Sequence, residues 1–201
     1  MHQIPDNPVS TWEEYFEVTL QKPLHPLFSI LEPYLPPTGR AFDLGCGVGH
    51  AVVWLANRGW TVDAIDGHPE ALRVLASRLS PDEKDRVHMQ SSRIEDAELT
   101  EMAYDLGIAA YSLFFAESRE AFGTLWSRIR TAIKPGGLFV GEFLGVRDDW
   151  AGQFISHTDA QVQSLLEEWE VVHLEEAEQD GHTSMGTEKH WHVFHVIARR
   201  V

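Results

Sequence analysis

The sequence is poor in cysteine and has no long apolar run, and both absences exclude classes of protein. Cys46 is the one cysteine of the 201 residues, so no disulfide can form within the chain, which suits a reducing cytosol. No apolar run approaches the ~18–20 residues that a membrane span needs, and no apolar segment follows a basic start as in a signal peptide. We therefore expect a cytoplasmic protein with no membrane partner.

Positive charge is also scarce. The chain has 16 Lys and Arg against 31 Asp and Glu, a net charge of −15, and no basic cluster interrupts this acidic balance. DNA and RNA bind to surfaces of the opposite sign, so we expect no nucleic-acid partner. The length suits one domain with its own core, and we expect a single domain over residues 1–201.

The sequence is distinctive over residues 40–66, where a strand, a glycine loop, a helix and a second strand are predicted in turn. Residues 41–44 are a short apolar run that stops at glycines, as a buried strand does. Glycine occupies every second position over 45–49, which suits a sharp turn or the close approach of a ligand. Apolar residues recur at helical spacing over 50–58, and a second strand follows over 61–66. Such a unit is typical of nucleotide-binding α/β proteins.

Two acids at the strand ends limit the ligand that this unit suits. Asp66 ends the second strand, where a carboxylate can accept hydrogen bonds from both hydroxyls of a ribose, or instead cap the turn or helix that follows. Asp43 stands just before the glycines, where it would repel a pyrophosphate and favour an ammonium group. His50 occupies the position of the third glycine in a dinucleotide fingerprint. An adenosyl group that carries an amino acid fits these features better than a dinucleotide does.

The segment Asp43-Leu-Gly-Cys-Gly-Val-Gly, followed by a helix, a strand and an acid, resembles motif I of the class I S-adenosylmethionine-dependent methyltransferases. The resemblance runs from about Arg40 to Gly145 and includes an Ile133-Lys-Pro-Gly-Gly turn before a strand. The layout is most similar to the small bacterial methyltransferases grouped with tellurite-resistance proteins. It implies an α/β, doubly wound, Rossmann-like methyltransferase fold, with a seven-stranded, mostly parallel sheet and a C-terminal antiparallel hairpin. It also implies N-terminal lid helices over 1–38 and a catalytic core over 39–201.

The same resemblance implies that S-adenosyl-L-methionine is the cofactor. Many relatives carry an acid at about position 92, where this sequence has Ser92, so the adenine contact is left to the Ile94 backbone or to a nearby acid. Tyr15 is a candidate contact from the lid, although the aromatic residues there could equally pack on the core. The implied cofactor-binding residues are Tyr15, Asp43, Leu44, Gly45, Cys46, Gly47, Gly49, Asp66, Gly67, His68, Ser92, Arg93, Ile94 and Ala110.

The segment after the fourth predicted strand bears on the methyl acceptor. Its residues, Ala110-Tyr-Ser-Leu, differ from the N/D-P-P-Y/F motif of DNA amino-methyltransferases, so the resemblance implies a small-molecule acceptor. The long polar and aromatic segment 145–158 is expected to border the acceptor pocket. No general base is evident, and a soft acceptor such as a thiolate needs none. The candidates for a catalytic residue are His50, Tyr111, His157 and His190.

Three histidines near the C-terminus raise the question of a metal site. His190 and His192 share one face of a predicted strand, while His195 points to the other. Metal ligands should converge on one point, so we expect no metal. As alternatives to methyl transfer, the chain could bind the cofactor without catalysis or, less in keeping with its motif, be a nicotinamide-dependent oxidoreductase. Either a monomer or a homodimer is compatible with the sequence.

Local signals predict several boundaries. Residues 1–9 carry two prolines and predict a loose tail, after which Ser10 or Thr11 would cap a helix that runs to Leu20. The C-terminal strands are expected to join through a turn at Asp180-Gly181.

Overall fold

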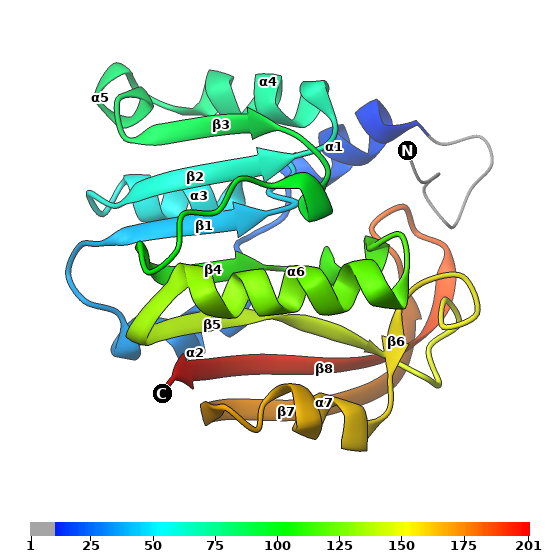
Figure 1. Ribbon diagram of the computed structural model, residues 1–201. Coiled ribbons are helices and arrows are strands. Elements are labelled where there is room, and N and C mark those ends of the chain that lie inside the picture. Colours follow the sequence, from blue (N-terminus) through cyan, green and yellow to red (C-terminus); the bar gives the residue numbers. More distant parts are fainter. Residues whose placement is uncertain (1–10) are drawn as a thin grey trace.

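A twisted β-sheet forms the centre of the computed structural model, which describes residues 11–201. The strand order is β3-β2-β1-β4-β5-β8-β7, and β6 pairs with β5 outside this path (Figure 1). The expected tail over 1–9 and the alternative cap at Ser10 lie outside the described residues. The strands are β1 (Arg40–Leu44), β2 (Thr61–Asp66), β3 (Val87–Ser91), β4 (Tyr104–Ala109), β5 (Ile133–Gly145), β6 (Ser156–His157), β7 (Trp169–His182) and β8 (Glu188–Arg200).

The directions of the strands place the functional edge of the sheet. Strands β1 to β5 pair in parallel, whereas β8 pairs antiparallel to both β5 and β7. The predicted seven-stranded, mostly parallel sheet with a C-terminal hairpin is confirmed, and the two-residue strand β6 is an addition at the end of β5. The carboxyl ends of the parallel strands meet at one edge, on the right of Figure 1, where ligands of such sheets bind.

Helices cover both faces of the sheet. In Figure 1, α6 and α7 lie in front of it, while α2 and α3 lie behind. None of the helices over residues 11–201 is long and apolar enough to cross a membrane. The α-helices are α1 (Trp12–Leu20), α2 (Leu27–Leu31), α3 (His50–Ala56), α4 (Pro69–Arg78), α5 (Pro81–Lys84), α6 (Arg119–Ala132) and α7 (Asp159–Leu165), and three short 3₁₀ helices are η1 (Glu32–Tyr34), η2 (Ile94–Asp96) and η3 (Leu113–Phe115).

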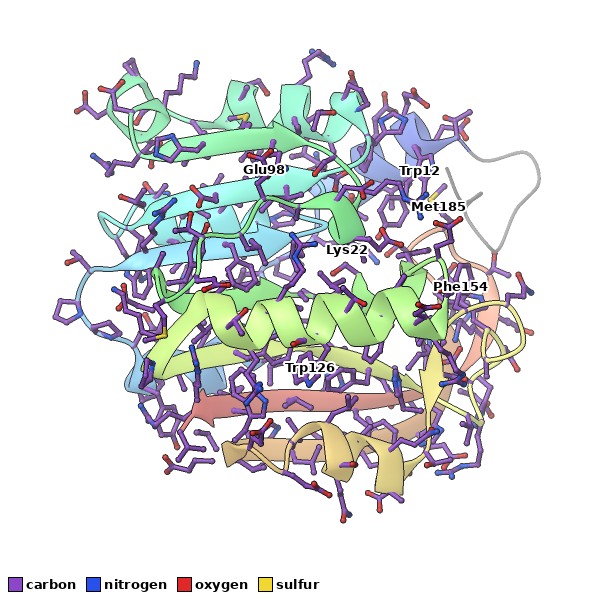
Figure 2. The ribbon with its side chains drawn as sticks, viewed as in Figure 1. Trp12, Lys22, Glu98, Trp126, Phe154 and Met185 are labelled. Carbon is purple, nitrogen blue, oxygen red and sulfur yellow. The ribbon has the colours of Figure 1, made fainter. Side chains whose placement is uncertain are left out.

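Each face of the sheet has its own apolar core. On the front face, Trp126 of α6 packs its ring 4.9 Å from that of Phe139 and 5.3 Å from that of Phe143, both on β5 (Figure 2). On the other face, helices α2, α3 and α4 bury apolar residues against β1 and β2. Apolar residues recur every three or four positions along α6, as an amphipathic helix requires, so burial against the sheet rather than local propensity holds it.

The helix start predicted near Thr11 is confirmed. The Thr11 hydroxyl accepts the Glu14 N–H at 3.2 Å, and the Glu14 carboxylate accepts the Thr11 N–H at 2.9 Å. This reciprocal pair satisfies two amide donors that would otherwise lack partners at the helix N-terminus. It holds α1 in place directly before the segment that reaches the functional edge.

The predicted position of the C-terminal turn is wrong. Asp180 and Gly181 lie within the paired part of β7, opposite His190 and Lys189. The turn covers Thr183–Thr187, where the Thr183 hydroxyl accepts the N–H of both Met185 and Thr187 at 3.2 Å. Gly186 supplies the left-handed backbone, with φ +85°, that closes this turn. The two strands are therefore longer than predicted, and their turn reaches beyond the edge of the sheet.

Candidate functional site

The glycine loop after β1 is built so that one of its glycines faces open space. The loop is held against β2 because the N–H groups of Gly45 and Cys46 both donate to the Ile65 carbonyl, at 2.8 and 3.0 Å. A Cβ on Gly49, whose φ is +79°, would come within 2.4 Å of Leu75, so this glycine serves helix packing. A Cβ on Gly47 would meet no heavy atom within 4 Å. The backbone at Gly47 is therefore open to a ligand.

Asp66 ties the glycine loop to the loop after β2. One carboxylate oxygen accepts the Gly47 N–H at 2.9 Å, and the other accepts the His68 N–H at 2.8 Å. Burial raises the pKa of Asp66, while these two hydrogen bonds oppose the rise. A carboxylate oxygen can accept more than one hydrogen bond, so the side chain both joins the two loops and keeps capacity for a ligand's hydroxyls.

Asp43 is a buried acid at the end of β1. Burial, followed by the nearby Asp66 carboxylate, raises the pKa of Asp43 to about 8. A cation beside it would favour the ionised form, because an opposite charge within a few ångströms lowers the pKa of a carboxylate. The site is therefore suited to a positively charged group, as the sequence predicts.

A cavity of about 490 Å³ opens where β1 and β4 end. We call one side of it the glycine-loop wall, formed by Asp43 and the lining residues among 45–51. The opposite side, the aromatic wall, consists of Tyr111, Phe114, Phe115, Trp150 and Trp191. A volume of this size is typical of pockets for small ligands. Of the predicted cofactor-binding residues, those that line the cavity are Tyr15, Asp43, Gly45, Cys46, Gly47 and Ala110.

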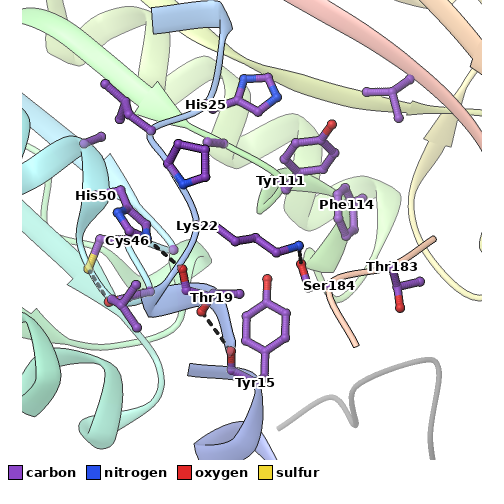
Figure 3. A pocket seen from close by; sticks show the side chains of 18 of the residues that line it. Tyr15, Thr19, Lys22, His25, Cys46, His50, Tyr111, Phe114, Thr183 and Ser184 are labelled. Carbon is purple, nitrogen blue, oxygen red and sulfur yellow. Dashed lines mark hydrogen bonds between the residues drawn. The ribbon is translucent and has the colours of Figure 1, made fainter. Parts of the chain in front are cut away.

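Residues 12–25, which we call the lid segment, run across the cavity from α1 toward the C-terminal hairpin. The Lys22 ammonium donates to the Ser184 hydroxyl at 3.0 Å, so the lid segment touches the turn between β7 and β8 (Figure 3). Trp12 from α1 and Met185 from that turn both line the cavity and lie on the same side of the molecule (Figure 2). The aromatic residues of α1 divide between the two predicted alternatives, ligand contact and core packing. Tyr15 lines the cavity, whereas Phe16 is buried in the core.

The remaining predicted cofactor residues, Asp66 among them, do not line the cavity. The Ser92 N–H donates to the Asp66 carbonyl at 3.2 Å, so the loop after β3 lies beside the loop after β2. His68 caps α4 by accepting the Glu70 N–H, and its ring lies 5.2 Å from that of Phe16. Leu44, Gly49, Gly67, Arg93 and Ile94 also lie outside the cavity lining. Arg93 forms ion pairs with Glu95 and Glu117.

The four catalytic candidates are not brought together. His50 lines the cavity, but Nε2 lies 2.9 Å from the Thr19 carbonyl and Nδ1 lies 3.3 Å from the Arg78 guanidinium (Figure 3). Because both of its nitrogens have partners, His50 offers no free base. Tyr111 also lines the cavity, and burial followed by the charge of Glu142 raises the pKa of its phenol, which makes it a hydrogen-bond donor.

The other two candidates lie away from the cavity. His157 is buried against Phe122, with ring centroids 4.6 Å apart, and burial lowers its pKa to about 4. His190 is on the outer face of the hairpin, where it pairs with Asp180 and Glu178 at 2.7 and 3.2 Å. Neither side chain can reach a ligand in the cavity from these positions.

The structure adds polar residues that the sequence analysis missed. Lys22, His25 and His195 line the cavity, and Glu142 lies buried beside the two histidines. Glu142 carried a readable signal, because a single acid in the apolar run of β5 has to find a partner. His195 was correctly placed on the opposite strand face from His190, but nothing in the sequence indicated what it would meet.

Segment 145–158, which the sequence predicts to border the acceptor pocket, contributes Trp150 to the lining of the cavity. The Lys189 ammonium pairs with Asp148, and both side chains are almost fully buried. The same ammonium lies 4.4 Å from the ring centre of Trp150 and 3.9 Å from that of Trp191. A buried ion pair thus fixes two rings of the aromatic wall.

Comparisons with known proteins bear on the family and on the fold. Residues 41–137 match the family described as "Methyltransferase domain". The "S-adenosyl-L-methionine-dependent Diels-Alderase iccD" of Talaromyces variabilis is 33% identical over 109 residues, which cover 52% of this chain and 36% of that protein. The match therefore spans only about a third of this relative's length.

Two solved structures share the fold at low sequence identity. TehB from Haemophilus influenzae superimposes with a TM-score of 0.73 at 15% identity, covering 94% of this chain and 66% of TehB. A 1,6-didemethyltoxoflavin-N1-methyltransferase from Burkholderia thailandensis, with 1,6-didemethyltoxoflavin and S-adenosylhomocysteine bound, gives a TM-score of 0.67 at 20% identity, covering 100% of this chain and 98% of that one.

The fold agrees with the resemblance to class I S-adenosylmethionine-dependent methyltransferases that the sequence predicted, including its likeness to TehB. Within the chain, residues 41–137 match the methyltransferase domain family, and the Burkholderia neighbour of the same fold holds S-adenosylhomocysteine.

Proposed function

We propose that the protein transfers the methyl group of S-adenosylmethionine to a small molecule held between the glycine-loop wall and the aromatic wall. The observation that carries this proposal is the juxtaposition of a buried acid and an open backbone at the cavity. Asp43 lines the cavity beside Gly47, where no heavy atom would meet an added Cβ within 4 Å. The carboxylate suits the ammonium of the cofactor's methionine part, and the open backbone leaves room for its chain.

The other cofactor contacts follow from the three adjacent loops. Asp66 would bind the ribose hydroxyls with the hydrogen-bonding capacity that remains after Gly47 and His68. The adenine would lie between the loops at 67–68 and 92–94, which are in contact through Ser92 and Asp66. Tyr15 would close over the ligand from the lid segment.

Catalysis would depend mainly on position. When bound, the cofactor supplies an electrophilic methyl group on a sulfonium, so little covalent help is needed from the protein. The chain's task is to align the acceptor with that methyl group and to exclude water. The lid segment serves this task, since Lys22 bridges to Ser184 across the cavity. The lid over 1–38 and the core over 39–201 then act as one domain.

The chemistry of the aromatic wall favours a small, largely apolar or aromatic acceptor. Five aromatic rings line this side of the cavity. The net charge of −15 disfavours nucleic acid as an acceptor. The Burkholderia protein, whose name includes an N1-methyltransferase activity on a small molecule, supports this class. Both nitrogens of His50 have partners, so His50 is not the base, and a thiolate acceptor would need none.

The alternative of cofactor binding without methyl transfer is supported by one specific observation. The relative from Talaromyces variabilis, 33% identical over the matched region, is named a Diels-Alderase that depends on S-adenosylmethionine. In such a case the same glycine loop would bind the cofactor, but no methyl group would leave it. Cytoplasmic location and a monomer or homodimer remain predictions.

The test is to incubate the protein with S-adenosylmethionine labelled on its methyl group and with fractions of a small-molecule extract. We expect label to pass to a low-mass product while S-adenosylhomocysteine accumulates in equal amount. Binding of the cofactor without any S-adenosylhomocysteine above the protein-free control, across all fractions, would contradict methyl transfer and favour the alternative.

A further inference from the structure

Glu142 presents a buried carboxylate oxygen without a hydrogen-bond donor. Its side chain is 1% exposed, and one oxygen accepts the Tyr111 N–H at 3.0 Å. The other oxygen, Oε1, has no hydrogen-bond partner among residues 11–201. Nδ1 of His25 and Nδ1 of His195 lie 3.6 and 3.5 Å from that oxygen. A buried polar atom without a hydrogen-bond partner is costly, so this oxygen is a candidate to bind a ligand.

The distances around Oε1 are too long for N–H···O hydrogen bonds and match the spacing of metal ligands. Hydrogen bonds of this type span about 2.7–3.2 Å. Two ligands at about 2.0–2.1 Å from a tetrahedral Zn²⁺ lie about 3.3 Å apart. His25, Glu142 and His195 each offer one ligand atom, and these atoms all lie within 4.8 Å of one another. Small side-chain shifts would bring all three to one ion.

The protonation of the histidines is compatible with metal binding. The Leu27 N–H donates to Nδ1 of His25 at 3.3 Å, so this nitrogen carries no proton, and a metal ion bound there would replace this long hydrogen bond. Nδ1 of His195 is buried and has no hydrogen-bond partner in the described chain. Two histidines and one carboxylate form a donor set that binds Zn²⁺ and leaves a position free for another ligand.

We propose that His25, Glu142 and His195 form a site for a divalent transition metal, best suited to Zn²⁺, with its open position facing the cavity. His25 and His195 both line that cavity, so an ion between them would be accessible from it. This differs from the expectation of no metal, which considered His195 only with His190 and His192. The three ligands come from the lid segment, β5 and β8, which are far apart in sequence.

The metal would also help to activate the acceptor, a step that rests on the proposed function. A hydroxyl or thiol of the acceptor at the open position would release its proton to solvent more readily, because a bound Zn²⁺ lowers the pKa of its ligand. Metal binding itself depends on neither cofactor nor acceptor.

The experiment measures metal binding to the chelator-treated full chain without any cofactor. Calorimetric titration with Zn²⁺ should show one ion per chain, and Co²⁺ should give the intense visible absorption of a tetrahedral site. Glu142→Gln and His195→Ala should each weaken Zn²⁺ binding at least about tenfold, since even indirect changes at zinc sites have effects of that size. His190→Ala, a histidine of the same strand outside the cavity, is the matched control and should bind as wild type does.

Wild-type protein that takes up no stoichiometric Zn²⁺, or Glu142→Gln and His195→Ala variants that bind it as wild type does, would overturn the proposal. Glu142→Gln keeps an oxygen for the Tyr111 N–H, and melting curves show whether each variant folds. If the variants fail to fold, the Co²⁺ spectrum of the wild type still decides. S-adenosylhomocysteine binding, measured separately, shows whether the proposed function stands when the metal site does not.

Discussion

The two walls of the cavity are made in different ways. The glycine-loop wall comes from one short stretch of chain, and its main contacts run between neighbouring strands, as between Asp66 and Gly47. The aromatic wall and its polar residues come from distant segments, as with Lys189 and Asp148, which are 41 positions apart in sequence. The first wall carries the motif on which the family resemblance rests, whereas the second is assembled from segments that lie mostly outside the family match over 41–137.

This difference suggests that the site binds the cofactor with one wall and selects the acceptor with the other. In the proposed function, the cofactor would be bound by backbone groups and acids of the glycine-loop wall, which lies within the family match over 41–137. The acceptor would be selected by side chains on the lid segment, the 145–158 segment and the hairpin, which that match does not include. Changes in one wall should therefore alter one property of the protein and spare the other.

The largest effect is expected from Lys189→Met in the aromatic wall. The variant leaves Asp148, whose side chain is 0% exposed, without its cation. Breaking a buried pair in this way costs about 3–5 kcal/mol of unfolding free energy. Chemical denaturation should show this loss, and the double variant Lys189→Met/Asp148→Asn should recover most of it. Cofactor affinity of the folded protein should stay at the wild-type value, and a parallel loss of affinity would show that the walls are coupled.

The next effect is expected from Asp66→Ala in the glycine-loop wall. Loss of two charge-assisted hydrogen bonds to the ribose should lower affinity for S-adenosylhomocysteine by about 3 kcal/mol, or ~100-fold. The protein should also melt at a lower temperature, because the N–H groups of Gly47 and His68 lose their acceptor. Calorimetric titration and a melting curve measure the two effects.

Asp63→Ala is the matched control for this variant. Asp63 lies on the same strand and accepts hydrogen bonds from Arg40 at 2.7 Å and Tyr104 at 2.5 Å, away from the cavity. Asp63→Ala should lower the stability of the protein and leave its affinity for S-adenosylhomocysteine intact. If Asp66→Ala behaves like this control, Asp66 only joins the two loops.

A smaller effect, about tenfold in affinity, is expected from Asp43→Asn. The pKa of Asp43 is about 8 in the free protein, so below pH 8 the carboxyl holds a proton that an ammonium ligand must displace. Wild-type affinity for S-adenosylhomocysteine should therefore rise about tenfold per pH unit between about pH 6 and 7.5, with release of one proton. The affinity of the Asn variant should not change with pH in this way. If its affinity depends on pH as strongly as that of wild type, a group other than Asp43 releases the proton.

The same pKa predicts how stability changes with pH in the free protein. The unfolded carboxyl loses its proton near its ordinary pKa of 3.8, whereas the folded one keeps it to about 8. The contribution of Asp43 to stability should therefore fall as the pH rises from about 4 to about 8. Asp43→Asn should remove this part of the pH dependence of unfolding.

The smallest effect is expected from Lys22→Ala in the lid segment. Lys22 is exposed, and its bond to the Ser184 hydroxyl is a surface contact. Such contacts contribute little, so we expect at most about a twofold faster release of S-adenosylhomocysteine. Stopped-flow dissociation measures this, with the exposed Lys84 of α5 changed to Ala as control. A tenfold faster release would mean that the lid segment contributes more than a surface contact to holding the ligand.

The sequence predicted the glycine-loop wall well because its signals are local. The signals are the glycines that follow a strand directly and the acids Asp43 and Asp66 at strand ends, all within one β-loop-α-β unit whose two loops are joined by the bond between Asp66 and Gly47. The cap at Thr11 was predictable for the same reason. The turn of the hairpin was misplaced because Asp180-Gly181 is a common turn pair, yet the hydroxyl of Thr183 stabilises a later one.

The other wall could not be read from the sequence because its contacts join remote positions. Glu142 stands out within an apolar strand, but its nearness to His25 and His195 follows from the order of β5 and β8 and the path of the lid segment. His157 and His190 have suitable chemistry for catalysis, and only the packing of the sheet shows that they face away from the cavity.

The central claim is that the glycine-loop wall binds the adenosyl amino acid of the methyl donor. Titration of the full chain with S-adenosylhomocysteine, followed by calorimetry and by melting temperature, tests it most directly, with NAD as the competing ligand. We predict one S-adenosylhomocysteine per chain and a melting temperature that rises with its concentration, because the ligand binds the native state, and no effect of NAD. No shift at millimolar S-adenosylhomocysteine, or a shift with NAD instead, would contradict the claim.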